Sequence, residues 1–314
     1  MISLDENDVV RLDESSVTRT TLVKPGMCGH NSLFVGQIGD WTWETVSALC
    51  GTNAFDARNP DGAPTYLSFY YFHIRASPAM HVNGLGFGDR IEITSRLFDF
   101  GSESVLALHK IKAAGGAPEP IDPDEFYAYG DEDCLYVENF NRWITRSDQG
   151  SNENLVKSSP VGFRHDHLPS LPEPYSPRRV YNHARSRHTF LDGIPDGRVP
   201  VAEPFGVDYR VDIARDLNGV GLLYFASYFS IADWALVAFW RHLGRSDEAF
   251  LGRVVLDQRL CYLGNADAGS VLRIEVESWR RIGVPGDEIV NLVLRDGDRV
   301  IAVSTVHLLT EGGS

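Results

Sequence analysis

Three tyrosines lie within the short segment of residues 65–72, which reads TYLSFYYF. A phenol has an ordinary pKa of about 10, so it attacks an acyl group only where nearby donors stabilise the phenolate. The phenyl ester that forms is itself an activated acyl group, which a thiol can accept. In an alternating strand, Tyr66 and Tyr70 would face one side and Tyr71 the other. Packing against neighbouring strands is the commoner role of such tyrosines, so both roles stay open.

Polar residues also precede two apolar helical segments. They are His30, Asn31 and Gln37 in the first half of the chain, and Asp216 and Asn218 in the second. Free N–H groups at a helix start stabilise developing negative charge, which an acyl-transfer reaction requires. We therefore expect these five residues to bind a thioester. The alternatives are that Asp216 and Asn218 cap a turn and that His30 is structural rather than a general base.

The helical segments themselves share a register. Each begins with an Asp-Trp pair, and Asp233 follows Asp40 by 193 positions, as Gly244 follows Gly51. Gly after the last apolar residue is the usual helix stop, because Gly tolerates the left-handed conformation there. The second segment is apolar nearly all round, which predicts a fully buried helix. These features indicate an internal duplication, with chance similarity as the alternative.

Runs of alternating apolar and polar residues surround both predicted helices and are typical of strands. In chain order they are 18–23, 65–75, 90–97, 105–111 and 135–146 in the first half, and 253–263, 271–278, 288–295 and 299–309 in the second. One buried helix wrapped by an antiparallel sheet, present twice, is the double hot-dog arrangement. The sequence therefore predicts an α+β double hot-dog fold.

Four regions follow from this pattern: an N-terminal tail at 1–16, a first hot-dog unit at 17–149, a proline-rich linker at 150–204 and a second hot-dog unit at 205–311. Prolines in the linker predict neither regular helix nor central strand. Arg178, Arg179, Arg185 and Arg187 lie there. We interpret them as either solvated charges or a contact surface for a phosphate-bearing ligand, such as coenzyme A or a carrier-protein arm.

Bulk composition excludes several classes of protein. The 314 residues are 43% hydrophobic and 23% charged, as in globular proteins, and the formal net charge is −14. That charge argues against nucleic acid as a partner. No apolar run approaches the roughly 20 residues that a membrane span needs, and the acidic N-terminus is unlike a signal peptide. We expect no membrane association and a cytoplasmic location.

The four cysteines have no metal-type spacing, so free thiols are expected. Cys28 could be a nucleophile, but no His or Asp partner spacing supports it. Zinc ligand sets, dinucleotide fingerprints and Walker loops are missing from the sequence, so neither a metal nor a cofactor is expected.

Residues 24–43, KPGMCGHNSLFVGQIGDWTW, resemble the N-terminal signature of the bifunctional acyltransferase/decarboxylase family of leinamycin-type polyketide biosynthesis. The resemblance covers most of the chain. It implies a double hot-dog enzyme that loads methylmalonyl from coenzyme A onto a tyrosine, decarboxylates it and passes propionyl to an acyl carrier protein with a phosphopantetheine arm. The family's catalytic tyrosine lies shortly after the first helix, and the matching position here is Tyr66.

Three other functions compete with this one. The segment from Asp216 to Tyr224 resembles the Asp-x-x-Gly…Tyr pattern of hot-dog acyl-CoA thioesterases, with extra residues before the tyrosine. A polyketide dehydratase of the same fold would need a His in a Gly-Pro context, which His81 and His109 lack. A non-catalytic carrier-docking protein is the third alternative. The sequence leaves the oligomeric state open, and a homodimer is one candidate.

Overall fold

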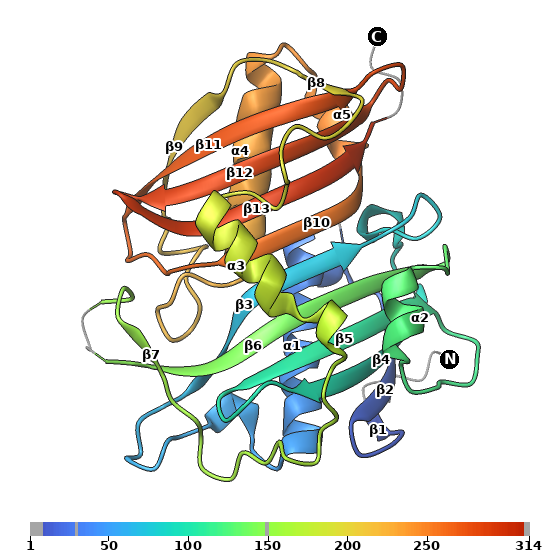
Figure 1. Ribbon diagram of the computed structural model, residues 1–314, viewed down its shortest axis with the longest axis vertical. Helices are drawn as coiled ribbons and strands as arrows, with labels where there is room; N and C mark the ends of the chain where they lie inside the picture. Colours follow the sequence, from blue (N-terminus) through green and yellow to red (C-terminus); the bar gives the residue numbers. More distant parts are fainter. Residues whose placement is uncertain (1–8, 29–30, 148–150, 311–314) are drawn as a thin grey trace. The chain divides into compact units, whose positions relative to one another are not determined.

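The computed structural model describes residues 9–28, 31–147 and 151–310 (Figure 1). The chain forms two compact units. Residues 1–149 and 154–177 make the first unit, and residues 150–153 and 178–314 make the second. The predicted linker is therefore divided between the two units.

The first unit is an antiparallel sheet with one long helix, α1 (Asn31–Cys50), against its inner face. The strands run in the order β1 (Val10–Arg11), β2 (Ser16–Leu22), β4 (Arg90–Asp99), β5 (Ser104–Ala113), β6 (Cys134–Arg146) and β3 (Tyr66–Arg75), and β7 (Leu155–Lys157) pairs with the end of β6. Val46 and Leu49 of α1 form a core with Val105, Trp143 and other inward side chains of the strands. Burial of these apolar residues stabilises the packing of the helix against the sheet.

The remaining elements of the first unit are short. They are the single-turn helices η1 (Pro25–Met27), η2 (Ala54–Asp56), η3 (Val82–Gly84) and η4 (Glu173–Tyr175), and the α-helix α2 (Pro123–Ala128). No helix was predicted from the sequence where α2 lies. Asp122 begins α2 by accepting hydrogen bonds from the amides of Asp124 and Glu125, so a cap followed by a proline forms this helix.

The second unit repeats the arrangement around α4 (Ser227–His242). Its strands run in the order β10 (Val254–Tyr262), β13 (Arg299–Leu309), β12 (Asp287–Asp296) and β11 (Val271–Arg281), and both β8 (Arg198–Pro200) and β9 (Phe205–Arg210) pair with β11. Two further helices are α3 (Pro177–Arg187) and α5 (Asp247–Leu251). Figure 1 shows α4 behind the strands and α3 in front of them.

The topology confirms the duplication and the double hot-dog fold. The strand order β3-β6-β5-β4-β2 of the first unit matches β10-β13-β12-β11-β9 of the second, and each central helix follows the first strand of its set in the chain. Gly51 and Gly244 end the two helices with φ of 68° and 76°. Both therefore use the left-handed conformation that glycine permits, as predicted.

The two helices differ in burial. Trp41 of α1 is buried, whereas Trp234 of α4 is 39% exposed and packs edge-on against Tyr209. The prediction of a helix buried all round was therefore wrong for α4. Its polar Asp233 forms an ion pair with Arg253 at 2.8 Å, so this side of the helix faces a polar boundary rather than the core.

Two predictions about irregular segments were also wrong. Residues 9–16 are part of the first unit, because Val9 packs on its core and β1 pairs with β2; residues 1–8 lie outside the described residues. The linker contains the regular helix α3. Pro177 occupies the first position of α3, where no backbone N–H is needed, so this proline starts the helix instead of excluding it.

Candidate active site

Tyr66 is the first residue of β3 and is half-buried. In an antiparallel pair, opposed residues point to the same face of the sheet. Tyr66 opposes Ile144 of β6, whereas Asn139 of β6 donates to Thr42 of α1 at 3.0 Å and so points to the inner face. Ile144 and Asn139 are an odd number of residues apart along β6. Tyr66 therefore points away from α1, on the outer face of the sheet.

A β-bulge at Tyr70 changes the alternation of β3. Phe69 opposes Asn141 and Tyr71 opposes Phe140, so Tyr70 is one extra residue in the strand. Phe140 and Ile144 share the outer face, which places Tyr71 on the same face as Tyr66. The Tyr70 ring contacts Arg142, which is also on the outer face. The prediction that Tyr71 would face the opposite side from Tyr66 and Tyr70 was wrong.

The surroundings distinguish the three tyrosines. Tyr71 is only 2% exposed, and the Tyr70 ring lies 4.4 Å from the Arg142 guanidinium and edge-on to Phe140. Within the described part of the chain, the Tyr66 hydroxyl has no hydrogen-bond partner. Tyr66 is thus the tyrosine whose oxygen is least engaged by the fold.

Arg142 is a candidate functional residue that sequence reasoning missed. It opposes Ser68, two residues along β3 from Tyr66, and its Nε donates to Ser104 Oγ at 3.2 Å. Such a diagonal neighbour lies about 7–8 Å away, within reach of a long side chain. A guanidinium there can stabilise a phenolate. Its place in β6 could have indicated this role, but only once the pairing of β6 with β3 was known.

A second polar cluster occupies the same face further along β3. Glu138 accepts a hydrogen bond from the Tyr127 hydroxyl at 3.0 Å, and its other oxygen lies 3.9 Å from His73 Nδ1. Both His73 and Glu138 are buried. Burial, together with the Glu138 charge, raises the pKa of Tyr127 well above its ordinary value. This cluster therefore keeps Tyr127 protonated and serves to anchor α2.

The start of α1 does not meet Tyr66. Trp43 Nε1 donates to the Leu67 carbonyl at 3.0 Å, which places the Tyr66 end of β3 beside the second half of α1. Asn31 begins the helix about 18 Å earlier along its axis, and Gln37 lies between them, half-buried. His30 lies outside the described residues. Within the first unit, the part of α1 that contains Asn31 and Gln37 is therefore not the part beside Tyr66, and their expected binding of a thioester stays a prediction.

Cys28 is a poor nucleophile in this setting. Burial, and then the nearby Asp89 charge, raise the pKa of its thiol, and Sγ lies 3.7 Å from the Leu85 carbonyl. A raised pKa lowers the thiolate fraction. All four cysteines are free, as predicted.

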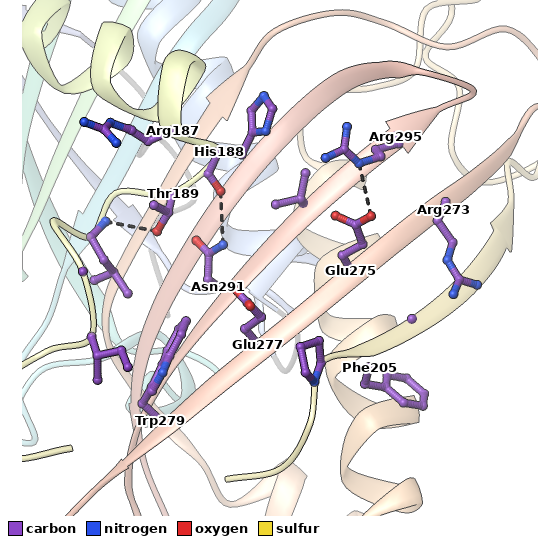
Figure 2. Close-up of a pocket in the computed structure, with 16 residues that line it drawn as sticks. Arg187, His188, Thr189, Phe205, Arg273, Glu275, Glu277, Trp279, Asn291 and Arg295 are labelled. Carbon is purple, nitrogen blue, oxygen red and sulfur yellow. Dashed lines mark hydrogen bonds and ion pairs between the residues drawn. The ribbon is translucent and has the colours of Figure 1, made fainter. Parts of the chain in front are cut away.

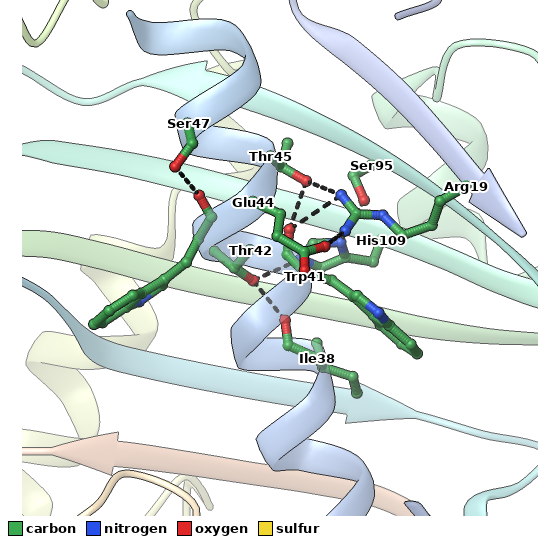
Figure 3. A network of polar contacts seen from close by, with 10 residues as sticks. Arg19, Ile38, Trp41, Thr42, Glu44, Thr45, Ser47, Ser95 and His109 are labelled. Atoms are coloured by element: carbon green, nitrogen blue, oxygen red, sulfur yellow. Dashed lines mark hydrogen bonds and ion pairs between the residues drawn. The ribbon is translucent and has the colours of Figure 1, made fainter. Parts of the chain in front are cut away.

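His109 belongs to a buried network in the middle of α1 (Figure 3). Its Nε2 lies 3.0 Å from Thr42 Oγ1 and its Nδ1 lies 2.7 Å from Ser95 Oγ. Burial, with a smaller contribution from the Arg19 charge, lowers the pKa of His109 to about 3. The imidazole is therefore neutral and enclosed, and it cannot act on a bound substrate as a dehydratase histidine would.

The same helix face carries an ion pair between a buried arginine and a partly exposed glutamate. The Arg19 guanidinium contacts the Glu44 carboxylate, donates to Thr45 Oγ1 at 2.9 Å and reaches the Trp41 carbonyl at 3.3 Å (Figure 3). The Arg19 side chain is 1% exposed, whereas that of Glu44 is 37% exposed. The pair ties β2 to α1.

In the second unit, Asp216 is completely buried and fully engaged. Its Oδ2 accepts from the Tyr209 hydroxyl at 2.7 Å and the Asp212 amide at 2.8 Å, and its Oδ1 accepts from Arg215 Nε at 3.1 Å. Burial, and then the hydrogen bond to Asp216, raise the pKa of Tyr209 to about 12. These contacts support a structural role for Asp216.

Asn218 caps a tight turn, which was the alternative to its predicted binding role. Its Oδ1 accepts from the amides of Val220 and Leu222, at 3.1 and 3.0 Å. The amide of Asn218 donates in turn to the Leu222 carbonyl at 2.9 Å. The turn directs the chain towards α4.

Replacing Asp216 with asparagine should cost about 2 kcal/mol of unfolding free energy, with little change in kcat. Asparagine has one acceptor oxygen, so its amide would point a donor either at Tyr209 or at Arg215. Urea unfolding followed by circular dichroism measures the loss. Asp212→Asn is the control, because among the described residues this exposed carboxylate accepts only from the amide of Ala214. Lost activity at unchanged stability would assign Asp216 to thioester binding instead.

Arg178 and Arg179 lie exposed on α3, together with Arg185 and Arg187. A cavity of about 640 Å³ adjoins the end of this helix (Figure 2). Its floor is the face of β11 and β12 that points away from α4, and this face carries Glu275, Glu277 and Trp279. Residues from the segment 187–194 border the cavity. Arg295 forms an ion pair with Glu275 at 3.3 Å across this floor.

No group of His, Cys, Asp and Glu in the part of the chain that the structure describes could hold a metal ion. No helix formed by the described residues is long and apolar enough to cross a membrane.

Solved structures with the same fold cover nearly the whole chain. A Lactobacillus plantarum protein described as an oleoyl thioesterase has a TM-score of 0.60 at 12% identity, over 96% of this chain and 99% of its own. The 12:0-ACP thioesterase of Umbellularia californica has a TM-score of 0.55 at 10% identity, over 94% of each chain. An acyl-ACP thioesterase of Bacteroides thetaiotaomicron has a TM-score of 0.51 at 9% identity, over 95% of this chain and 100% of its own. At these identities the likeness shows the fold alone.

Sequence comparison is more specific. No curated protein is significantly similar to the chain. Residues 18–192, more than half of the chain, match the family described as the LnmK N-terminal Hot Dog Fold domain. That range includes most of β2 and all of α1, Tyr66, Arg142 and α3. The chain therefore belongs to the LnmK family of leinamycin-type biosynthesis.

Proposed function

We propose that the chain is an acyltransferase with decarboxylase activity, which converts methylmalonyl-CoA to a propionyl group loaded on an acyl carrier protein. Membership in the LnmK family supports this reaction class. The observation that carries the proposal is Tyr66: it is half-buried and its hydroxyl is free of partners among the described residues. Arg142 supplies a cation on the same face of the sheet.

In the first step, the Tyr66 oxygen attacks the thioester carbonyl. A C–O bond forms, the C–S bond breaks, and the phenol proton leaves with the coenzyme A thiolate. Arg142 stabilises the phenolate that attacks, because an opposite charge favours the ionised form. The product is a methylmalonyl ester of the tyrosine.

In the second step, the ester loses carbon dioxide. The electrons of the breaking C–C bond move into the ester carbonyl, and the enolate that results takes a proton from solvent water at the α-carbon to give propionyl-tyrosine. The ester carbonyl is itself the electron sink, so the chemistry needs no cofactor. It needs donors at the enolate oxygen and a site that removes water from the carboxylate.

In the third step, the thiol of the carrier's phosphopantetheine arm attacks the propionyl ester. A C–S bond forms, the C–O bond to the phenol breaks, and the thiol proton returns to Tyr66. A phenol is a good leaving group, so the acyl group moves readily to the carrier. The enzyme is regenerated with no net change.

Thioester hydrolysis is the second candidate function. It is supported by the thioesterases that share the fold. The sequence feature that suggested it, Asp216, is engaged by Tyr209 and Arg215, which weakens the case. A non-catalytic carrier-docking protein is the remaining alternative.

Incubation of the protein with methylmalonyl-CoA and a holo-carrier protein, read by mass spectrometry, separates the three functions. We expect the carrier to gain a propionyl group. Release of free acid would identify a thioesterase, and recovery of unchanged methylmalonyl-CoA would identify a docking protein. Either of these two results would refute the proposal.

A further inference from the structure

The helix α3 concentrates positive charge in an acidic protein. It contains four arginines in 11 residues and no acidic side chain, whereas the whole chain has 29 basic and 43 acidic residues. Arg178 and Arg185 are seven residues apart, which places them on one stripe of the helix. If these arginines were only solvated charges of a linker, we would expect them to be spread along it and not gathered in one helix.

The second unit holds α3 in a fixed orientation. Ala184 is fully buried, and Cys261 Sγ of β10 lies 4.0 Å from the Tyr181 carbonyl. Just after the helix, Asn291 Nδ2 of β12 donates to the His188 carbonyl at 3.1 Å. One side of α3 is therefore fixed against the strands, and the opposite side is presented to solvent.

The presented side of α3 carries arginines that are separated from one another. Arg179 and Arg185 are exposed there, and neither forms an ion pair with any residue that the structure describes. Arg179 and Arg185 are about 9 Å apart along the helix axis. A small phosphate ligand needs donors that converge in a concave site. Charges spread over such a distance suit an extended acidic surface instead.

We propose that this face of α3 is the docking surface for the acyl carrier protein, through a carrier helix rich in Asp and Glu beside its phosphopantetheine arm. The inference rests on the proposed carrier-dependent function. The overall charge of −14 repels an acidic partner, so a local basic surface is required to orient it. Contacts of exposed charges chiefly set the rate of encounter and the orientation of the complex.

Binding of an apo acyl carrier protein, which lacks the arm, tests the surface separately from catalysis. The double variant Arg179→Glu/Arg185→Glu should raise the Kd measured by fluorescence anisotropy about tenfold or more, and the wild-type Kd should rise with salt. The control is Arg210→Glu/Arg280→Glu, which makes the same charge change at two other exposed arginines of the second unit. The control should bind nearly as the wild type does. Unchanged melting of both double variants would verify folding.

Three results would overturn the docking surface. The first is equal weakening of carrier binding by both double variants, and the second is absence of carrier binding by the wild type. The third is a raised KM for methylmalonyl-CoA with unchanged carrier binding, because this result would make α3 a coenzyme A site. Charge removal by Arg179→Gln/Arg185→Gln should give a smaller weakening in the same direction. If the carrier binds as expected but never gains propionyl, the proposed reaction fails and the docking surface stands.

Discussion

Tyr66→Phe should lower propionyl transfer to the carrier protein by about a thousandfold or more, because the substitution removes the attacking oxygen. The ring stays, so packing of β3 and the melting temperature should change little. The structure strengthens this expectation, since among the described residues no hydrogen bond to the Tyr66 hydroxyl would be lost. Initial rates measured with methylmalonyl-CoA and holo-carrier, together with intact-protein mass spectrometry, provide the test.

Tyr70→Phe is the matched control. Tyr70 is on the same face of the same strand and contacts Arg142 through its ring, which phenylalanine retains. This variant should keep most of the activity. Digestion of the wild type after brief exposure to methylmalonyl-CoA should also yield an acylated peptide containing residues 64–70. Full activity of Tyr66→Phe would contradict the assignment and leave His30, Cys28 or direct transfer between the two thiols.

Glu44→Ala should destabilise the protein by about 3 kcal/mol, because it leaves the buried Arg19 guanidinium without its counter-charge. Burial already lowers the pKa of Arg19, and the Glu44 charge offsets part of this effect. Thr45 and the Trp41 carbonyl can accept from Arg19, but neither neutralises it. Urea unfolding and hydrogen exchange of the α1 amides would measure the loss.

Arg19→Met is the informative control for the ion pair. It removes the buried charge, fills similar space and leaves Glu44, whose side chain is 37% exposed, in contact with water. We expect a loss of about 1 kcal/mol or less. The test compares the two losses of unfolding free energy, and we expect the loss in Glu44→Ala to be the larger. Equal losses would contradict this expectation, because they would mean that the partly exposed Glu44 needs its counter-charge as much as the buried Arg19 does.

The central helices and the long strands could be predicted from sequence because they repeat a local pattern. Gly51 and Gly244 end the helices where the repeat of 193 residues placed them. The strands of seven residues or more were predicted within a few residues, whereas the six-residue β9 was missed. Elements set by single local contacts were missed. Pro177 starts α3 and Asp122 caps α2, and neither changes the hydrophobic periodicity.

The candidate site was less predictable, since it depends on which strands are neighbours. Tyr66 was found through its position after the first helix, but its face and its neighbour Arg142 follow from pairing with β6. Asp216 and Asn218 have the composition of a binding loop and the contacts of a structural one. Residue type gives no means of separating those two roles before the partners are known.

The bulge at Tyr70 has a consequence for how this strand can change in evolution. Removing Tyr70 would join Phe69 and Tyr71 into a regular ladder along β6, with every other side chain still on its own face. Insertion or deletion elsewhere in β3 would move the side chains of part of the strand to the opposite face of the sheet, because side chains alternate with a period of two. Among related chains, position 70 is therefore where β3 can gain or lose a residue while the tyrosine at its start and the apolar residues over α1 keep their places.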